Sequence, residues 1–173
     1  MRRHLLLIGL PGAGKSTVGR LLAERLGSHC TDIDPILERA TGLTVAELFA
    51  EEGEPSFRVR EHRAVLEALG LPPHVVAPGG GWAVEPGQLE EAVAAGRPIP
   101  IHLAVDPAVA AARLAGGPSR PLLAGDPRSR LTALAAHRRP FYQRAPVEVD
   151  VSDRSPAEVA DLLVAIARSE AGW

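Results

Sequence analysis

The residues best suited to chemistry lie near the amino terminus, in the segment Gly9-Leu10-Pro11-Gly12-Ala13-Gly14-Lys15-Ser16-Thr17. This segment fits the pattern G-x-x-x-x-G-K-[ST], a loop whose backbone N–H groups surround the phosphates of a nucleotide. Of the 19 lysines and arginines in the chain, only Lys15 is a lysine. A compact ammonium can reach between the β- and γ-phosphates, where the wide planar fork of arginine would not fit. We therefore expect the chain to bind a nucleoside triphosphate.

The sequence around this loop predicts a strand before it and a helix after it. His4-Leu5-Leu6-Leu7-Ile8 is an apolar run without alternation, as expected for a buried parallel strand. Apolar residues then recur at helical spacing from Val18 to Leu26, and Gly27 provides a stop. The first N–H groups of such a helix point at the anion site. The alternative is a glycine-rich turn that matches the pattern by chance, and such a turn would not require a strand before it and a helix after it.

Two aspartates in Asp32-Ile33-Asp34 end a second short strand, which we expect to begin at Cys30. Residues i and i+2 of a strand face the same side, so both carboxylates can point into one crevice. Asp32 and Ser16 could bind a magnesium ion carried by ATP, because Mg²⁺ prefers hard oxygen ligands. Asp34 could accept a proton from an attacking hydroxyl or orient that hydroxyl. Alternatively, Asp34 only caps the next helix, with Pro35 at its first position.

Arg58 lies in a charged segment, Gly53-Glu54-Pro55-Ser56-Phe57-Arg58-Val59-Arg60-Glu61. Taken alone, this segment fits an amphipathic helix on which Arg58 pairs with a neighbouring glutamate. Such a pair would lie on a solvated face and contribute little.

Three other segments are weaker signals. Gly79-Gly80-Gly81 directly follows a predicted strand, and its cost in backbone entropy indicates either a close approach to a ligand or a tight turn. Arg120 lies in an irregular segment that begins at Gly116, and His137-Arg138-Arg139-Pro140-Phe141-Tyr142 ends a predicted helix. None of the three points to a ligand by itself.

Short apolar strands alternate with helical patterns along the chain, which is typical of βαβ units and a parallel sheet. Glutamates follow Thr44 and Ser155 at capping-box spacing, so a helix begins near each. We expect further helices over residues 55–69, from Pro86, after the N-cap pair Asp106-Pro107 and over 127–142, and further strands over 74–77, 99–105 and 147–151. The prediction is one domain, residues 1–173, with five strands.

Composition limits the kind of protein. The 173 residues have the size of a single domain, and 46% hydrophobic content is ordinary for a globular protein. A net charge of −2 gives no electrostatic reason to expect nucleic acid or a membrane as a partner. The single cysteine, Cys30, cannot form a disulfide within the chain, which favours a reducing cytosol. The apolar run at the start is too short for a signal peptide or a membrane span.

Taken in order, these motifs resemble those of the shikimate kinase family over nearly the whole chain. The segments that carry the resemblance are Gly9–Thr17, Asp32 and Asp34, Gly53–Glu61, Gly79–Gly81, Arg120-Pro121-Leu122-Leu123 and Arg138–Tyr142. The resemblance implies the three-layer α/β/α fold of P-loop nucleoside monophosphate kinases, with a five-stranded parallel sheet. A substrate-binding helical region would cover about residues 33–61, and a mobile lid would cover about residues 114–126.

The implied activity is ATP-dependent phosphorylation of the 3-hydroxyl of shikimate, giving shikimate 3-phosphate in aromatic amino-acid biosynthesis, by a cytoplasmic monomer. For the nucleotide, the resemblance implies that Gly12 to Thr17 bind the phosphates, with Lys15 on the β- and γ-phosphates. Ser16 would bind Mg²⁺, and Asp32 would lie in its outer shell. Arg113 and Pro156 would flank the adenine.

For the substrate, the resemblance implies that Arg58 and Arg138 bind the carboxylate of shikimate, while the backbone of Gly79 to Gly81 completes the pocket. Asp34 would bind the reacting hydroxyl, and Arg120 from the lid would reach the transferring phosphoryl group. The residues implied to line the ring are Val45, Phe49, Phe57, Glu61, Pro121 and Leu122.

Two features depart from the usual pattern of the family. Pro78 precedes the triple glycine and Trp82 follows it. At the position of Trp82 the family usually has a small or medium residue. Its indole could pack on the core or narrow the substrate site. The segment from Arg120 to Arg138 is slightly shorter than is common.

Two other functions are open at the level of sequence. One is a kinase of the same fold that acts on another small molecule, such as gluconate. The other is a nucleotide-binding regulator that has lost turnover. Loss of turnover predicts a damaged catalytic set, whereas all of its members are present, namely Lys15, Ser16, Asp32, Asp34 and Arg120.

Overall fold

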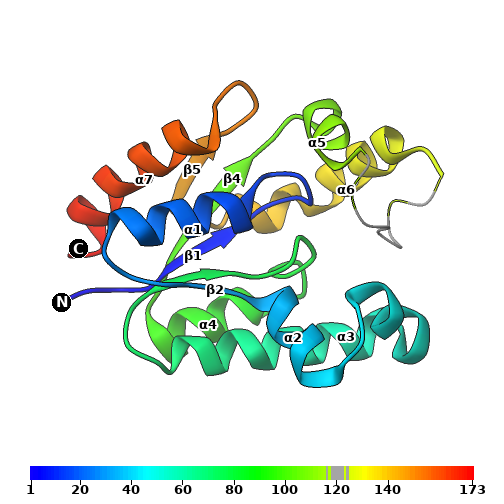
Figure 1. The fold of residues 1–173 in the computed structure, drawn as a ribbon, viewed down its shortest axis with the longest axis horizontal. Helices are drawn as coiled ribbons and strands as arrows, with labels where there is room; N and C mark the ends of the chain where they lie inside the picture. Colours follow the sequence, from blue (N-terminus) through cyan, green and yellow to red (C-terminus); the bar gives the residue numbers. More distant parts are fainter. Residues whose placement is uncertain (116, 118–122, 124) are drawn as a thin grey trace.

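The computed structural model describes residues 1–115, 117, 123 and 125–173 (Figure 1). Within these residues, five parallel strands form one sheet in the order β2-β3-β1-β4-β5. The strands are β1 (Leu5–Ile8), β2 (Cys30–Asp32), β3 (Val75–Ala77), β4 (Ile99–Ala104) and β5 (Val147–Asp150). The five-stranded parallel sheet predicted from the sequence is therefore confirmed.

The central strands are buried because their residues are apolar on both faces. In β1, Leu5 and Leu7 pack into the core on one side of the sheet, while Leu6 and Ile8 pack into the core on the other. This alternation follows from the two-residue period of a strand. The edge strand β5 instead alternates between partly buried and exposed residues.

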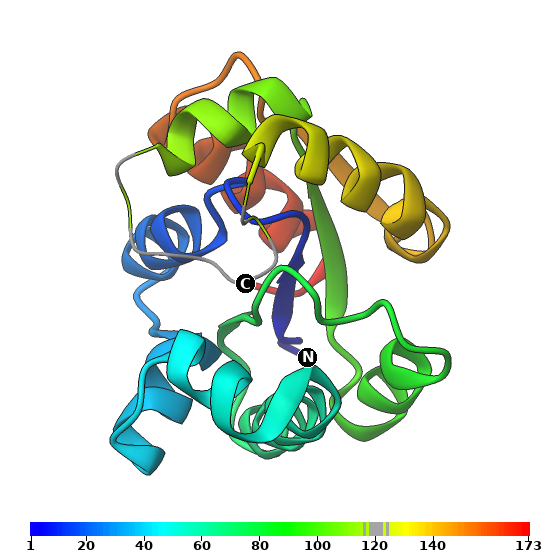
Figure 2. The same ribbon diagram turned by 90° about the vertical axis from the view of Figure 1, so that its right-hand side faces the viewer.

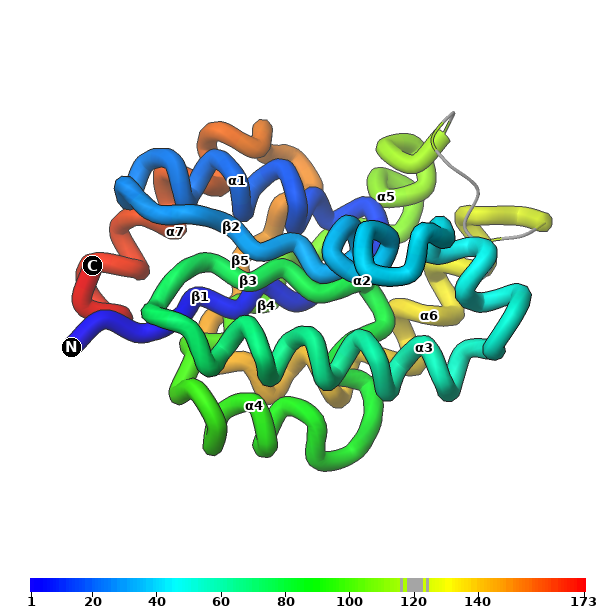
Figure 3. The backbone as a smooth tube through the Cα atoms, turned by 60° about the horizontal axis from the view of Figure 1, so that its bottom comes forward, coloured from blue at the N-terminus to red at the C-terminus, as the bar shows by residue number. Residues whose placement is uncertain are grey.

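Helices cover both faces of the sheet, which gives the three layers that the resemblance implied (Figure 3). α1 (Lys15–Arg25) and α7 (Pro156–Glu170) cover one face, and α3 (Val45–Leu69) and α4 (Gln88–Gly96) cover the other. α2 (Ile33–Thr41) packs on α3, and α5 (Pro107–Leu114) packs on α6 (Pro127–Tyr142). None of the helices in the described part of the chain is long and apolar enough to span a bilayer.

Local sequence signals determine where several helices begin. The hydroxyl of Thr44 accepts a hydrogen bond from the N–H of Glu47 at 3.2 Å, and the Glu47 carboxylate accepts one from the N–H of Thr44 at 2.7 Å. The same reciprocal pair joins Ser155 and Glu158 at the start of α7. Both predicted capping boxes are confirmed, and Asp106 caps α5 as predicted.

The helix predicted over residues 55–69 is confirmed as the second part of α3, because the backbone leaves the helical conformation at a kink at Gly53 (φ 77°, ψ 164°). The first part begins after Thr44, where a helix start was also predicted. One predicted boundary is wrong. The helix predicted from Pro86 begins at Gln88.

Asp34 does not cap a helix. α2 begins at Ile33 with Asp32 as its N-cap residue, so Asp34 lies inside the first turn. The alternative in which Asp34 only caps a helix that starts at Pro35 is therefore wrong.

Candidate active site

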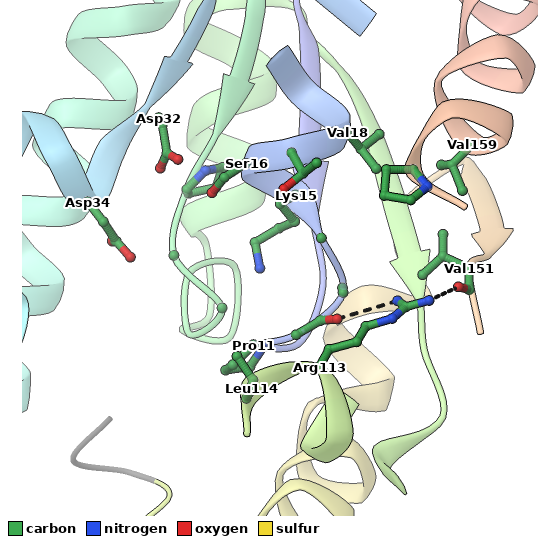
Figure 4. Close-up of a pocket in the computed structure, with 18 of the residues that line it drawn as sticks. Pro11, Lys15, Ser16, Val18, Asp32, Asp34, Arg113, Leu114, Val151 and Val159 are labelled. Carbon is green, nitrogen blue, oxygen red and sulfur yellow. Dashed lines mark hydrogen bonds between the residues drawn. The ribbon is translucent and has the colours of Figure 1, made fainter. Parts of the chain in front are cut away.

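A cavity of about 440 Å³ lies at the carboxyl ends of the central strands, between α1, α5 and the start of α7 (Figure 4). Its volume is in the range of small-molecule sites, and open parallel sheets bind ligands at this edge. The lining residues are Pro11 to Val18, Asp32, Asp34, Pro78 to Gly80, Arg113, Leu114, Val151, Arg154, Pro156 and Val159. The cavity thus joins the predicted nucleotide loop to both aspartates.

Glycines shape the nucleotide loop, Gly9 to Thr17. Gly12 (φ 84°) and Gly14 (φ 87°) adopt the left-handed backbone conformation, which favours glycine. A Cβ on Gly12 would also lie 2.7 Å from the carbonyl oxygen of Ala110 on α5. Gly14 is the N-cap residue of α1 and has no side chain to cap it. A phosphate can therefore accept hydrogen bonds from the first N–H groups of the helix.

Lys15 is the first residue of α1, and only 8% of it is exposed. Its Nζ donates to the carbonyl oxygens of Gly9 at 2.9 Å and Leu10 at 3.1 Å. These bonds hold the ammonium beside the loop, where it points into the cavity (Figure 4). Lys15 therefore lines the cavity, and its contact with phosphates stays a prediction.

Asp32 and Asp34 come from the end of β2 and the first turn of α2, and both line the cavity, with Asp32 on the side of Ser16 (Figure 4). The prediction that both carboxylates face one crevice is confirmed. No group of three or more His, Cys, Asp or Glu side chains in the described residues could hold a metal ion. A divalent cation at Ser16 and Asp32 would take its other oxygen ligands from phosphates and water, as Mg²⁺ does with nucleotides.

Arg113 and Pro156, which the resemblance implied to flank adenine, line the same cavity. The Arg113 guanidinium is held in place by the chain after β5. Its Nη2 donates to the carbonyl oxygen of Val151 at 2.6 Å (Figure 4) and to that of Ser152 at 3.2 Å. These bonds fix a flat cationic group at the wall of the cavity.

Sequence reasoning missed four residues of this wall, namely Leu114, Val151, Arg154 and Val159. A signal was available for two of them. Arg154 and Val159 flank the Ser155–Glu158 capping box, which places them beside Pro156 at the start of α7.

Arg58 lies on the part of α3 after the kink and is 8% exposed. Its Nη1 donates to Glu61 Oε2 at 2.5 Å, and its Nη2 donates to Glu54 Oε1 at 3.1 Å. Burial by itself would lower the pKa of Arg58, but the two glutamates outweigh it and hold that pKa above its ordinary value. Burial raises the pKa of Glu61, and Arg58 opposes the rise. The predicted pairing is confirmed, but the predicted solvated face is wrong.

The triple glycine after β3 lies against these charged groups. A Cβ on Gly79 would lie 3.0 Å from Asp34 Oδ1 and even closer to Glu61 Oε1. A Cβ on Gly81 would lie 2.8 Å from Arg58 Nη1 and overlap the rest of the guanidinium. The backbone therefore approaches these side chains closely. A close approach to a ligand, one of the two explanations that the sequence suggested, stays a prediction.

Gly80, between them, contacts the nucleotide loop. A Cβ on Gly80 would lie 2.6 Å from the backbone nitrogen of Pro11. None of the three glycines has a positive φ, so each is required by a lack of space and not by backbone conformation. The turn is thus packed between the nucleotide loop and α3.

Arg138, on α6, reaches the same turn and is 3% exposed. Its Nη1 donates to the carbonyl oxygen of Gly80 at 2.7 Å, and the hydroxyl of Tyr142 donates to the same oxygen at 2.6 Å. Burial raises the pKa of Tyr142, so its hydroxyl keeps the proton that it donates. One carbonyl oxygen therefore joins α6 to the turn, opposite the side on which Arg58 lies.

Aromatic residues pack beside Arg58. The rings of Phe49 and Phe57 lie 4.7 Å apart between centroids, and the Arg58 guanidinium carbon lies 5.5 Å and 5.3 Å from those centroids. Val45 and Phe49 pack against the hydrophobic core cluster that contains Phe57. Trp82 is 1% exposed and packs in the core, so of the two places proposed for its indole, the core is correct. Arg120, Pro121 and Leu122 lie outside the described residues.

Comparison with known proteins agrees with this geometry. The family model for shikimate kinase matches residues 11–168. The chain is 47% identical to a shikimate kinase of Thermobifida fusca over 91% of this chain and 90% of that protein. It is 40% identical to a shikimate kinase of Rhodococcus jostii over 95% of this chain and 98% of that protein.

Among solved structures, some resemble this chain in both sequence and fold, and others in fold alone. A shikimate kinase from Acinetobacter baumannii in complex with shikimate matches with a TM-score of 0.90 and 32% identity, over 98% of this chain and 94% of that chain. A gluconokinase from Sinorhizobium meliloti matches with a TM-score of 0.63 and 20% identity, over 99% of this chain and 94% of that chain. At that identity the second match shows a common fold and nothing more.

Proposed function

This chain belongs to the shikimate kinase family, and we propose that it transfers the γ-phosphoryl group of ATP to the 3-hydroxyl of shikimate. The product is shikimate 3-phosphate, on the route to aromatic amino acids. The observation that carries the proposal is the pair of buried arginines, Arg58 and Arg138, on either side of the glycine turn beside the phosphate cavity. Two guanidinium groups give directional, bidentate recognition of a carboxylate, which lysine would not.

The nucleotide occupies the cavity of about 440 Å³. Its phosphates bind to the N–H groups of residues 12–17 and to Lys15, and its adenine lies between Arg113 and Pro156. The left-handed glycines of the loop and the uncapped start of α1 support the first assignment. The bonds from Arg113 to the chain after β5 support the second.

The substrate lies between the two arginines and Asp34. Asp34 lines the phosphate cavity, and Gly79 packs against both Asp34 and Glu61, the partner of Arg58. A carboxylate bound by the arginines would therefore leave the ring hydroxyl near Asp34, which holds it in line with the γ-phosphorus. The hydroxyl oxygen forms the new bond to phosphorus as the bond to the leaving oxygen of ADP breaks, and the hydroxyl proton passes to Asp34 or, if Asp34 only orients the hydroxyl, to the transferred phosphoryl group. Positioning and charge neutralisation contribute most, because the transition state is loose.

Mg²⁺ supplies charge neutralisation on the β- and γ-phosphates. Ser16 and Asp32 fit this cation, because both present oxygen atoms to the cavity on the same side. We assign Ser16 as the direct ligand and Asp32 as the acceptor of a water in the outer shell. Two protein groups are enough when the phosphates complete the coordination.

The remaining parts of the proposal concern the chain as a whole. Residues 1–173 form one domain, in which about 33–61 bind substrate. The predicted lid over about 114–126, which would bring Arg120 to the transferring phosphoryl group, lies partly outside the described residues. The enzyme is a cytoplasmic monomer without a nucleic-acid or membrane partner. The net charge of −2 supports the lack of such partners. The chain has a single cysteine, Cys30, so no disulfide can form within it, and this supports a reducing compartment.

The deciding assay is the release of ADP by the purified protein with Mg²⁺ and ATP, measured with shikimate, with gluconate and with no acceptor. We expect release to depend on shikimate. Release that depends on gluconate, or none with either acceptor, would contradict the proposal and indicate one of the two alternatives.

The arginine pair gives a second, residue-level test. Arg58→Ala should raise the KM for shikimate at least tenfold and change that for ATP less than about twofold, because a charged hydrogen bond to the carboxylate contributes roughly 1.5–3 kcal/mol. Arg63→Ala is the matched control, since Arg63 lies on the same helix in an exposed pair with Glu67. Equal effects of Arg58→Ala on both KM values would remove Arg58 from the substrate site.

A further inference from the structure

Trp82, the residue that departs from the family's usual pattern, closes the glycine turn. The backbone N–H of Trp82 donates to the carbonyl oxygen of Gly79 at 3.2 Å, so Gly79, Gly80, Gly81 and Trp82 form one turn between β3 and α4. Its indole is buried in the core cluster that also contains Phe57 and Tyr142. The side chain and the backbone of Trp82 therefore both hold the turn.

The indole also makes a specific bond to α3. Trp82 Nε1 donates to Nδ1 of His62 at 3.2 Å, and the two rings lie nearly parallel, 6.0 Å apart between centroids. An indole N–H can only donate, so Nδ1 accepts and the proton of the imidazole is on Nε2. That Nε2 donates to Glu91 Oε2 at 3.0 Å. A continuous chain of hydrogen bonds thus runs from the turn through α3 to α4.

The next residue, Ala83, has a backbone conformation that is unfavourable for alanine. Ala83 has φ 72°, in the left-handed region that residues with a Cβ rarely adopt, and it is 1% exposed. Such a conformation persists only where the surroundings enforce it. Ala83 directly follows Trp82, whose indole is bonded to His62.

The turn held in this way contacts both of the arginines that the proposed function assigns to the substrate. Gly81 packs directly on the Arg58 guanidinium, and the carbonyl oxygen of Gly80 accepts the bonds from Arg138 and Tyr142. Figure 2 shows the segment between β3 and α4 passing between α3 and α6. The position of the turn relative to α3 therefore sets the distance between a guanidinium from α3 and one from α6.

We propose that Trp82 and His62 are positioning residues for the acidic substrate: their hydrogen bond fixes the glycine turn against α3 so that Arg58 and Arg138 are spaced for one carboxylate. A displacement of about 1 Å in such a pair can cost a large part of its contribution. This inference rests on the proposed function, since it assumes a carboxylate between the two arginines. It assigns a role to two residues that touch neither substrate nor nucleotide.

The test is a calorimetric titration of shikimate, and separately of a non-hydrolysable ATP analogue, into the intact protein and five variants. Trp82→Phe keeps an aromatic ring but removes the N–H donor, and His62→Leu removes the acceptor. His62→Asn restores an acceptor near the position of Nδ1. Trp173→Phe is the matched control, because Trp173 makes its indole bond to Arg3 near the chain ends. The fifth variant combines Trp82→Phe with His62→Leu.

We expect Trp82→Phe and His62→Leu each to weaken shikimate binding about three- to tenfold, as for the loss of one hydrogen bond. The double variant should be no weaker than either single variant, because both remove the same bond. His62→Asn, Trp173→Phe and the affinity for the ATP analogue should change less than about twofold. These results would separate positioning from general damage, which would weaken both ligands.

Three results would overturn the inference. The first is unchanged shikimate affinity in both single variants, and the second is additive loss in the double variant. The third is equal loss of affinity for the ATP analogue. A wild-type protein that binds the ATP analogue but not shikimate would instead overturn the proposed function, and this inference with it.

Discussion

A single methyl group at Gly81 should disable the substrate site without touching the nucleotide loop. In Gly81→Ala the added Cβ would lie 2.8 Å from Arg58 Nη1 and closer to the rest of the guanidinium. Gly81 does not have a positive φ, so alanine adopts the same backbone without strain. The effect therefore comes from contact with Arg58 alone, which must leave its place.

The size of the effect follows from the partners of Arg58. Glu61 is fully buried, and removing the partner of a buried ion costs about 3–5 kcal/mol. Burial already raises the pKa of Glu61, so it can take up a proton, and we expect the lower end of that range. For a chain of this size, about 3 kcal/mol lowers the Tm by about 6–12 °C. Loss of one charged hydrogen bond to the carboxylate, about 1.5–3 kcal/mol, raises the KM for shikimate about 10- to 150-fold.

The measurements are the two KM values and the Tm of Gly81→Ala against wild type. Gly70→Ala is the control, because Gly70 ends the same helix, and its nearest neighbour to an added Cβ is the Glu67 carbonyl oxygen at 3.3 Å. The KM for ATP should stay within about twofold of wild type in both variants. If Gly81→Ala keeps the wild-type KM for shikimate and the wild-type Tm, the guanidinium does not occupy the place described, and the reasoning fails.

Two further predictions concern other parts of the molecule. Arg113→Met should raise the KM for ATP about tenfold and leave that for shikimate unchanged, because the bonds to Val151 and Ser152 hold a wall of the nucleotide site; equal changes in steady-state kinetics would contradict the assignment. The Tm should fall as the pH is lowered from about 7.5 to about 5.5, because burial lowers the pKa of His4 and His74 below the ordinary 6.5. The unfolded chain then binds protons that the native state excludes, and a calorimetric Tm that is constant or rises over this interval would be evidence against it.

The geometry of the loop around Lys15 and of several helix starts was predictable because their determinants are local. The loop around Lys15 is contiguous in sequence, and the left-handed glycines that it needs are part of the motif itself. The capping boxes at Thr44 and Ser155 close within four residues, so they determine helix starts without help from the rest of the fold. The apolar run of β1 likewise predicts a central strand from composition alone.

The substrate half was not predictable from the residues alone, because its determinants are remote contacts. The sequence places Arg58 one turn from Glu54 and Glu61, and that pairing is correct. Nothing local says that backbone at Gly81 covers the guanidinium and excludes water from it. Similarly, the bond from Arg138 to Gly80 joins residues 58 positions apart, so only the folded sheet brings them together.

The glycine turn shows why this half of the site depends on the whole fold. Gly79 is required by carboxylates from α2 and α3, Gly80 by Pro11 in the nucleotide loop, and Gly81 by Arg58. Each glycine therefore has to be small because of a different neighbour. The proposed function assigns these neighbours to the binding of different ligands. Arg138 and Tyr142 on α6 both donate to the backbone carbonyl oxygen of Gly80. A substitution at Gly80 therefore cannot remove this acceptor and can only change its position. Side chains that set the position of this backbone, Trp82 among them, are therefore the remaining means of changing the geometry that the substrate meets.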